Sequence, residues 1–264
     1  MTSPLGPLAP LGGARLERVL NVVLLEETAS TNDVARALIE RMVAEETEIL
    51  PTCIAARRQT AGKGRAGRSW STTGEGAVAV SLVAPWPEGP DRIRVPVTAG
   101  IRLAQALSAA WGVELRLKWP NDLFCRGKKL GGILVEGRTL PDGAGYVVVG
   151  VGLNVSTTRA ELDALELPYA TSLALEGVDG AALGGDLPLV AVLSALDATL
   201  EGEIDDLPAA FAAVTLHREG DPLEVRDGER VVTGRYRGLT ADGLLRLETD
   251  GGVAELISGD VTSF

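Results

Sequence analysis

The chain has 264 residues, of which 45% are hydrophobic, and a formal net charge of -11. This length and apolar content are sufficient for one large domain, or for a large domain with a smaller one attached. The net charge argues against a non-specific nucleic-acid binder, because such proteins attract phosphate backbones with a positive field. No run of about 18 apolar residues occurs. The opening segment lacks the basic and apolar regions of a signal peptide, so we expect a soluble, cytoplasmic protein that does not enter a membrane.

Few residues of this chain are suited to redox chemistry or to binding transition metals. Its two cysteines, Cys53 and Cys125, lie far apart and have no metal-binding neighbour in the sequence. We therefore expect neither a disulfide framework nor a zinc site, and interpret both as small buried apolar residues. His217 is the only histidine. A histidine-based metal cluster is thereby excluded, and we assign His217 no catalytic role.

Strands and helices alternate in the first four fifths of the chain. A strand is predicted over residues 19–25, followed by a helix from about residue 32 that Thr31 or Asn32 would cap. Further strands are predicted around residues 53–56, 77–84, 114–118, 132–136 and 146–153, with helices near 97–111, 158–165 and 188–201. This order predicts an α/β or α+β main domain over residues 19–215, preceded by a flexible segment over 1–18.

The last fifth of the chain, residues 216–264, has a different sequence pattern from the rest. Short β-rich stretches such as RVVTGRYRGL and VAELISG are separated by Asp-Gly and Gly-Gly turns. The pattern predicts a small β-barrel or meander of the size of an SH3-like module.

A cationic, glycine-rich segment stands out in this acidic protein. Residues 57 to 74 contain five cations and no acidic residue, and the cations are interleaved with glycines in GKGRAGR. The spacing satisfies G-x-G-x-x-G, but the residues that follow are poor helix formers, which disfavours a Rossmann turn and a nicotinamide oxidoreductase. We predict a loop that closes over phosphates and a carboxylate, with Trp70 beside it to stack on a purine. The alternative for Trp70 is a core residue.

The four lysines of the chain lie in two short segments, whereas the other basic residues are all arginine. Lys118 precedes Asn121 and Asp122 in KWPND, and Lys128 and Lys129 open KKLGGILVE. Lysines close to two anionic groups favour a reaction between a carboxylate and an α-phosphate, which charge repulsion otherwise opposes. Asn121 and Asp122 are candidates for positioning a magnesium ion. A β-turn with a surface pair of lysines is the alternative.

These segments together resemble the biotin-protein ligases. Five motifs follow the order of that family between about residues 20 and 156, namely Ser30-Thr31-Asn32, Gln59 with AGKGRAGR, KWPND, KKLGGILVE and GVGLNVS. The resemblance implies an α+β fold, with a class II synthetase-like catalytic domain of mixed sheet and flanking helices, and a small C-terminal SH3-like β-barrel. It implies a ligase that uses ATP and Mg²⁺ to convert biotin to biotinyl-5'-AMP. The biotinyl group would then pass to a lysine of a biotin carboxyl carrier protein or domain.

The resemblance also implies roles for individual residues. At the biotin ring it places Ser30, Thr31, Asn32 and Gln59, whose short polar groups match the ureido donors and acceptors. Around the biotin carboxylate and the acyl-phosphate it places Lys63, Gly64, Arg65, Lys129, Gly131 and Gly132. On the nucleotide side it places Arg68, Trp70, Lys118, Asn121 and Asn154, with Asp122 at the magnesium ion. Lys118, Arg65 and Lys129 are the implied catalytic residues, and Lys128 is expected to face solvent.

Two departures from the family pattern affect these expectations. The adenylate loop is often GRGRRGR in the family, whereas Lys63 and Ala66 make it GKGRAGR here, so we expect the reactive intermediate to be held somewhat less tightly. Too little chain precedes Ser30 for the winged helix-turn-helix of bifunctional members, so we expect no operator binding. Family members commonly form homodimers through the sheet of the catalytic domain, so a homodimer is what the resemblance implies, whereas the sequence itself does not reveal the oligomeric state. A lipoate-protein ligase and a non-enzymatic biotin-responsive regulator are the alternative functions.

Overall fold

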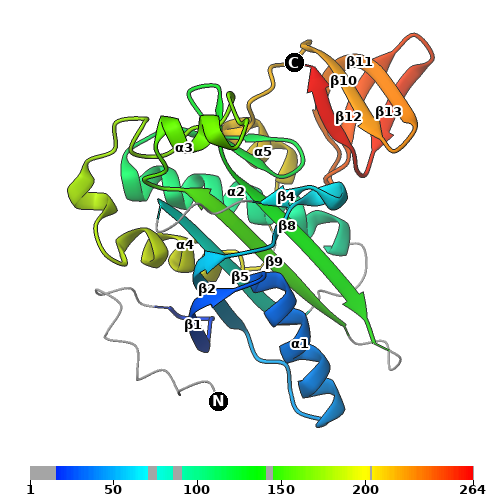
Figure 1. Ribbon diagram of the computed structural model, residues 1–264. Coiled ribbons are helices and arrows are strands. Elements are labelled where there is room, and N and C mark those ends of the chain that lie inside the picture. Colours follow the sequence, from blue (N-terminus) through cyan, green and yellow to red (C-terminus); the bar gives the residue numbers. More distant parts are fainter. Residues whose placement is uncertain (1–15, 71–75, 86–90, 141–144, 203, 264) are drawn as a thin grey trace.

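The computed structural model describes residues 16–70, 76–85, 91–140, 145–202 and 204–263, and its larger domain is built on a seven-stranded sheet (Figure 1). The strand order is β1-β2-β5-β9-β8-β7-β6. The strands are β1 (Asn21–Thr28), β2 (Thr52–Gln59), β5 (Ala77–Pro85), β6 (Leu115–Lys118), β7 (Asp122–Cys125), β8 (Lys128–Thr139) and β9 (Gly145–Asn154). Strand β1 pairs with β2 in parallel, and all the other neighbours are antiparallel. The sheet is therefore mixed, as the resemblance implies.

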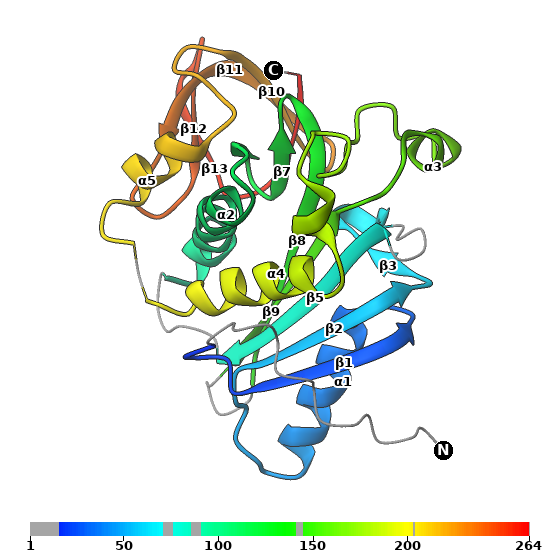
Figure 2. The ribbon, with the colours of Figure 1, turned by 90° about the vertical axis from the view of Figure 1, so that its left-hand side faces the viewer.

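Helices cover both faces of this sheet (Figure 2). On one face lie α2 (Asp91–Trp111), α4 (Leu187–Ala198) and α5 (Leu207–Val214), which bury the larger apolar core. On the other face lies α1 (Thr31–Ala44), which buries a smaller core that includes Ala35 and Ile39. The short helices α3 (Arg159–Ala164) and η3 (Gly180–Leu183) belong to the connection between β9 and α4.

The C-terminal domain is a five-stranded antiparallel sheet of order β13-β12-β11-β10-β14 (Figure 1). Its strands are β10 (Pro222–Asp227), β11 (Arg230–Leu239), β12 (Leu245–Thr249), β13 (Gly252–Leu256) and β14 (Asp260–Ser263). The sheet is open, because no pairing joins β13 to β14 among the described residues. Its buried face is continuous with the larger core, where Leu223 and Tyr236 join the same cluster as Leu117 and Phe211. The predicted small β domain is thus confirmed, although as an open sheet.

Several predicted boundaries are wrong. Helix α2 begins six residues before the predicted start and includes Pro96, because proline tolerates helical φ although it lacks the N–H donor. Helix α5 was not predicted, since its eight residues are almost all apolar and show no periodicity. The cap of α1 is Ser30 instead of Thr31 or Asn32, and Thr31 is already helical.

The described chain is anchored at its start by one buried carboxylate. Asp197 on α4 is 5% exposed and accepts hydrogen bonds from the backbone N–H groups of Glu17, Arg18 and Val19 at 3.2, 2.8 and 2.7 Å. Arg18 also forms an ion pair with Asp197. Of the segment 1–18 predicted to be flexible, residues 1–15 lie outside the described residues. The contacts to Asp197 fix the path by which the chain enters β1.

Candidate active site

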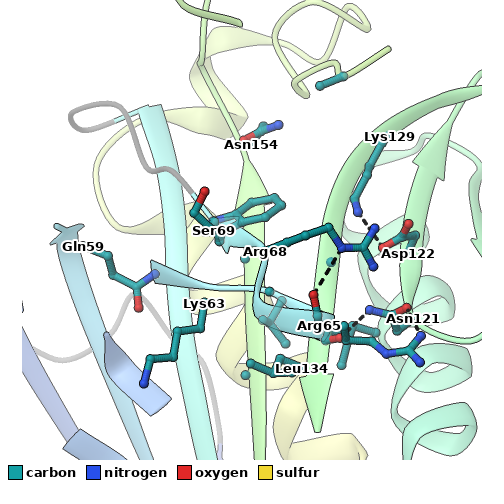
Figure 3. Close-up of a pocket in the computed structure, with 18 of the residues that line it drawn as sticks. Gln59, Lys63, Arg65, Arg68, Ser69, Asn121, Asp122, Lys129, Leu134 and Asn154 are labelled. Carbon is teal, nitrogen blue, oxygen red and sulfur yellow. Dashed lines mark hydrogen bonds and ion pairs between the residues drawn. The ribbon is translucent and has the colours of Figure 1, made fainter. Parts of the chain in front are cut away.

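A cavity of about 320 Å³ lies between the glycine-rich loop and the sheet. Figure 3 shows Gln59 and Lys63 on one side of the hairpin formed by β3 (Gly62–Lys63) and β4 (Ser69–Trp70), and Asn121, Asp122 and Lys129 on the other. Fourteen predicted site residues line it: Ser30, Thr31, Asn32, Gln59, Lys63, Gly64, Arg65, Arg68, Trp70, Asn121, Asp122, Lys129, Gly132 and Asn154. Segments more than a hundred residues apart in the sequence therefore share one site.

The polar end of the cavity is a set of buried hydrogen-bonding groups at the start of α1. Ser30, Thr31 and Asn32 are 2%, 3% and 4% exposed. The Oε1 atom of Gln59 accepts a hydrogen bond from the backbone N–H of Thr31 at 2.7 Å. The same oxygen accepts a second hydrogen bond from the Thr31 hydroxyl at 3.1 Å, so Thr31 fixes the orientation of the Gln59 amide. Ser30 makes no side-chain cap bond on the helix, which leaves its hydroxyl to the cavity.

The amide of Asn32 is oriented by two neighbours. Its Nδ2 donates to the Glu136 carboxylate on β8 at 2.6 Å, and its Oδ1 accepts from the Ser81 hydroxyl on β5, also at 2.6 Å. The Glu136 partner shows which atom of the Asn32 amide is the nitrogen, because an ionised carboxylate accepts hydrogen bonds and does not donate them. Asn32 therefore presents a carbonyl oxygen with a defined direction at the polar end of the cavity.

The floor of the cavity is a part of β9 that has no side chains. Gly150 and Gly152 lie two residues apart and so face the same side of the strand. A Cβ atom added to Gly150 would lie less than 3 Å from the Asn32 side chain, and one added to Gly152 less than 3 Å from the Trp70 ring. These glycines were not predicted as site residues, although they belong to the GVGLNVS motif. Their alternate spacing on a strand is the feature that could have identified them.

The glycine-rich segment folds as a small hairpin above this floor. Strands β3 (Gly62–Lys63) and β4 (Ser69–Trp70) pair, and the single turn η1 (Arg65–Gly67) joins them. Ala66 and Gly67 have φ values of 53° and 73°, in the left-handed region that turns require. In the described residues up to Trp70 the motif is followed by strand β4 and not by a helix, which agrees with the rejection of a Rossmann turn.

The cations of the site are paired with carboxylates from other elements. The Nζ atom of Lys63 lies 2.6 Å from Asp33 on α1, and that of Lys129 lies 2.6 Å from Asp122 on β7. The Nη1 atom of Arg65 donates to Oδ1 of Asn121 at 3.0 Å. The two lysine–carboxylate pairs join groups 30 and 7 residues apart, so the fold brings these opposite charges together, whereas the Asn121 amide is an uncharged partner of Arg65.

Lys118 lies beside the cavity and not in its lining. It ends strand β6, with its Nζ 5.7 Å from the centre of the Phe124 ring. Burial lowers the pKa of the Lys118 ammonium, while Asp122 and Asp260 oppose that shift. Gly131 is likewise outside the lining and packs against the backbone of Gly152. Lys128 is exposed, as predicted.

An apolar part of the lining was missed by the sequence analysis. The apolar lining residues that were not predicted are Ile133, Leu134, Val151, Leu162, Leu165, Leu167 and Ala170. The last four come from α3 and the segment after it, where no motif or spacing indicated a site. The polar Ser69 and Thr157 and the two glycines of β9 also line the cavity and were not predicted. The cavity therefore combines a polar end, an apolar wall and a cationic end.

His217, to which no catalytic role was assigned, is 4% exposed and lies where the chain enters the C-terminal domain. Its ring centre is 5.6 Å from that of Tyr236. Burial, followed by the charge of Lys118, lowers the pKa of His217 to about 4. His217 is therefore neutral near pH 7 and belongs to the packing between the domains.

Comparisons with known proteins agree with this arrangement. Residues 25–154 match the biotin/lipoate A/B protein ligase family, and residues 220–262 match the biotin protein ligase C-terminal domain. The biotin--[acetyl-CoA-carboxylase] ligase of Mycobacterium tuberculosis is 33% identical over 92% of this chain and 88% of that protein. The chain belongs to the biotin-protein ligase family.

Other members of the biotin-protein ligase family match with different coverage. The bifunctional ligase/repressor BirA of Bacillus spizizenii is 28% identical, and the match covers 80% of this chain but only 65% of that protein. The biotin protein ligase of Aquifex aeolicus, solved with biotin and ATP, superposes with a TM-score of 0.69 at 26% identity over 92% of this chain and 98% of that one. Among the described residues, no helix is long and apolar enough to cross a membrane.

Proposed function

We propose that this chain is an ATP-dependent biotin-protein ligase. The observation that carries the proposal is a single cavity that joins a buried, pre-oriented polar end to a cationic end. The polar end suits the ureido ring of biotin, because Ser30, Asn32 and Gln59 bring polar groups of fixed orientation to the cavity. The apolar wall suits its hydrocarbon chain, and the cationic end suits its carboxylate and the phosphates of ATP.

In the first step, a carboxylate oxygen of biotin attacks the α-phosphorus of ATP, and pyrophosphate leaves. We assign Lys129 to the biotin carboxylate, and Arg65 with Lys118 to the charge that develops at the α-phosphate. For Lys129 this requires an exchange of its present partner, Asp122, for the substrate. Trp70 and Asn154 are assigned to the nucleotide side, where the indole ring offers a stacking surface. Lys63 and Gly64 of the hairpin close over the anhydride that forms.

Magnesium is part of this proposal. Asp122 is the acidic residue among the described residues of the lining, and no cluster of three or more His, Cys, Asp or Glu side chains able to hold a metal occurs in the described part of the chain. That donor set fits Mg²⁺, which is commonly held by one or two carboxylates together with substrate phosphates and water. The ion would neutralise charge on the phosphates, and Asp122 would hold it.

In the second step, the deprotonated amine of an acceptor lysine attacks the carbonyl carbon of biotinyl-5'-AMP, an amide forms, and AMP leaves. The proposed acceptor is a biotin carboxyl carrier protein or domain, since the Mycobacterium relative is named as a ligase for acetyl-CoA carboxylase. Absence of operator binding and dimerisation through the sheet of the catalytic domain are further proposals. A gel shift with a biotin-operon promoter and analytical ultracentrifugation test them.

Biotin-dependent exchange of labelled pyrophosphate into ATP tests the first step. The proposal is supported if exchange requires biotin and Mg²⁺ and falls at least 100-fold in Lys118→Ala. It also requires that the enzyme biotinylates an added carrier domain. Lys128→Ala is the matched control, because Lys128 is an exposed lysine in the next hairpin. Exchange with lipoate but not with biotin would instead assign the chain to the lipoate ligases.

A further inference from the structure

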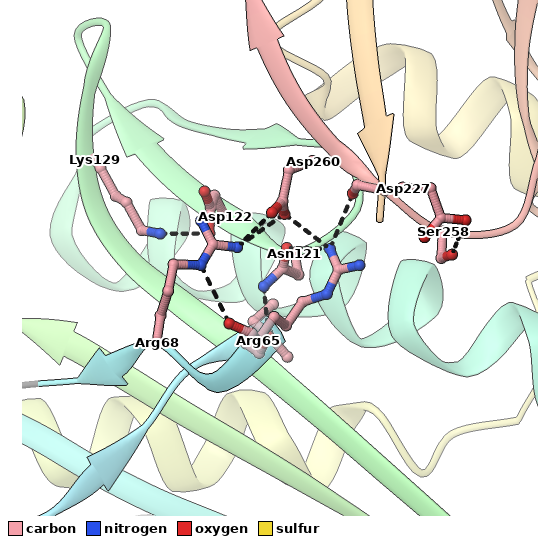
Figure 4. A network of polar contacts seen from close by, with 10 residues as sticks. Arg65, Arg68, Asn121, Asp122, Lys129, Asp227, Ser258 and Asp260 are labelled. Atoms are coloured by element: carbon pink, nitrogen blue, oxygen red, sulfur yellow. Dashed lines mark hydrogen bonds and ion pairs between the residues drawn. The ribbon is translucent and has the colours of Figure 1, made fainter. Parts of the chain in front are cut away.

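A carboxylate of the C-terminal domain reaches the two arginines of the glycine-rich hairpin (Figure 4). Asp260, the first residue of β14, accepts hydrogen bonds from Nη2 of Arg68 on both of its oxygens, at 2.9 and 2.8 Å. The same carboxylate lies 3.7 Å from Nη1 of Arg65, and the neighbouring Gly259 carbonyl accepts from that atom at 3.2 Å. Asp260 therefore bridges two domains and neutralises part of the proposed phosphate site.

The two arginines are held to different degrees. The Arg65 side chain is 24% exposed and has two further acceptors, Asn121 and the Gly259 carbonyl. The Arg68 side chain is 57% exposed, and among the described residues it donates hydrogen bonds to Asp260 and to the carbonyl of Arg65. Arg68 is consequently the guanidinium that can change partner at small cost, whereas Arg65 stays in place.

A carboxylate and a phosphate compete for a guanidinium with the same geometry, because both accept a pair of parallel N–H bonds. In the structure both oxygens of Asp260 contact a single nitrogen of Arg68, Nη2. A triphosphate that contacts Arg68 must therefore displace Asp260 or share the guanidinium with it. Lys118 is affected by the same carboxylate, since the charge of Asp260 raises its pKa against the effect of burial.

We propose that Asp260 is a positioning residue of the nucleotide site that acts through Arg65 and Arg68. It holds both guanidiniums in place before ATP binds, and Arg68 exchanges the Asp260 carboxylate for a phosphate oxygen when ATP binds. This inference rests on the proposed function, because it takes ATP as the ligand. As a consequence, the contact of the C-terminal domain with the hairpin depends on whether ATP is bound, and that contact in turn lowers the affinity of the adenylation site for ATP.

The coupling is reciprocal by linkage: if Asp260 weakens ATP binding, then ATP binding weakens the contact of β14 with the hairpin. Among the described residues, β14 is an edge strand that pairs with β10 alone, and its register with β10 is interrupted at Glu224 and Val225. Loss of the Arg68 contact should therefore be visible as faster amide exchange in residues 257–263.

The test compares full-length wild type, Asp260→Asn and Asp250→Asn. Asp250 lies in the turn between β12 and β13, at the opposite edge of the same sheet, so its substitution removes the same charge away from the site. The affinity for α,β-methylene-ATP is measured by calorimetry with saturating biotin. For an exposed ion pair of this kind we expect the analogue to bind about two- to five-fold more tightly to Asp260→Asn than to the wild type. The affinity for biotin and the binding by Asp250→Asn should stay at wild-type values.

Unchanged or weaker binding of the analogue by folded Asp260→Asn would overturn the proposal, and so would an equal gain in Asp250→Asn. A second measurement avoids the variants altogether: amide exchange in residues 257–263 of the wild type should accelerate when the analogue binds, and slower or unchanged exchange contradicts the partner exchange. A wild type that binds the analogue but shows no biotin-dependent pyrophosphate exchange refutes the proposed function and leaves this comparison intact. A wild type that does not bind the analogue refutes both.

Discussion

Replacement of Gly150 by alanine should selectively weaken biotin binding. The added Cβ would lie less than 3 Å from the Asn32 side chain, a distance that forces one of the two groups to move. Any movement of the Asn32 side chain breaks a hydrogen bond, because its amide is bonded to both Glu136 and Ser81 at 2.6 Å. Strand β9 is also fixed, since it is paired on both sides in the middle of the sheet. The clash is therefore relieved by rotation of Asn32 away from its partners.

The intramolecular hydrogen bonds that this rotation breaks set the loss of stability, and the lost contact of the Asn32 carbonyl with biotin sets the loss of affinity. A hydrogen bond to a charged group contributes roughly 1.5 to 3 kcal/mol and a neutral one about 1 kcal/mol. The ligand-directed carbonyl of Asn32 is displaced at the same time. We expect the dissociation constant for biotin to rise about 30- to 100-fold, equivalent to roughly 2 to 3 kcal/mol. Affinity for an ATP analogue should change less than three-fold, because Trp70 and the hairpin are not touched.

Calorimetric titration of Gly150→Ala with biotin checks this expectation. Gly180→Ala is the matched control, since an added Cβ at Gly180 meets nothing within 4 Å and its backbone is not in the left-handed region. Overpacking should also lower the stability of Gly150→Ala by about 1 to 3 kcal/mol, so thermal unfolding is recorded in parallel. A folded Gly150→Ala protein that binds biotin within three-fold of wild type would refute the placement of the biotin ring beside Asn32.

Three further predictions test other parts of the structure. In Gly152→Ala the new methyl group displaces the Trp70 ring, so the KM for ATP in pyrophosphate exchange should rise about ten-fold or more with little change for biotin, and an unchanged KM would argue against stacking on Trp70. The pKa of His217 is about 4 in the folded protein and near 6.5 when unfolded, so the unfolded state takes up the proton first and stability falls as pH drops below about 6.5. Between pH 8 and pH 5 the free energy of unfolding in urea should therefore fall by roughly 2 kcal/mol more in the wild type than in His217→Gln. Equal decreases in the two proteins would contradict the lowered pKa of His217. Asp197→Ala leaves three backbone N–H groups without their acceptor and should cost about 3 kcal/mol or more, measured as a lower urea midpoint, whereas a cost below about 1 kcal/mol would show that water replaces the carboxylate.

Much of the site was predictable because its residues occur in compact motifs. Ser30 to Asn32, the GKGRAGR segment and KWPND each place several chemically suited groups within a few residues, and most of them line one cavity. Residues that contribute only backbone or apolar surface were missed. Leu162 and Ala170 are ordinary hydrophobic residues whose position at the cavity depends on how the segment after β9 folds back over the sheet.

The amino-acid sequence by itself determined most of the strands and helices, though not α5, together with the change to a β-rich tail and the chemical character of the site, since these depend on local periodicity and on short motifs. Only the tertiary structure decided which carboxylate faces which cation. Asp33, Asp122 and Asp260 come from a helix, a hairpin strand and the C-terminal domain, and each meets one of the cations of the site. Ion pairing acts through space over a few ångströms, so it depends on the packing of distant segments, which no local pattern records.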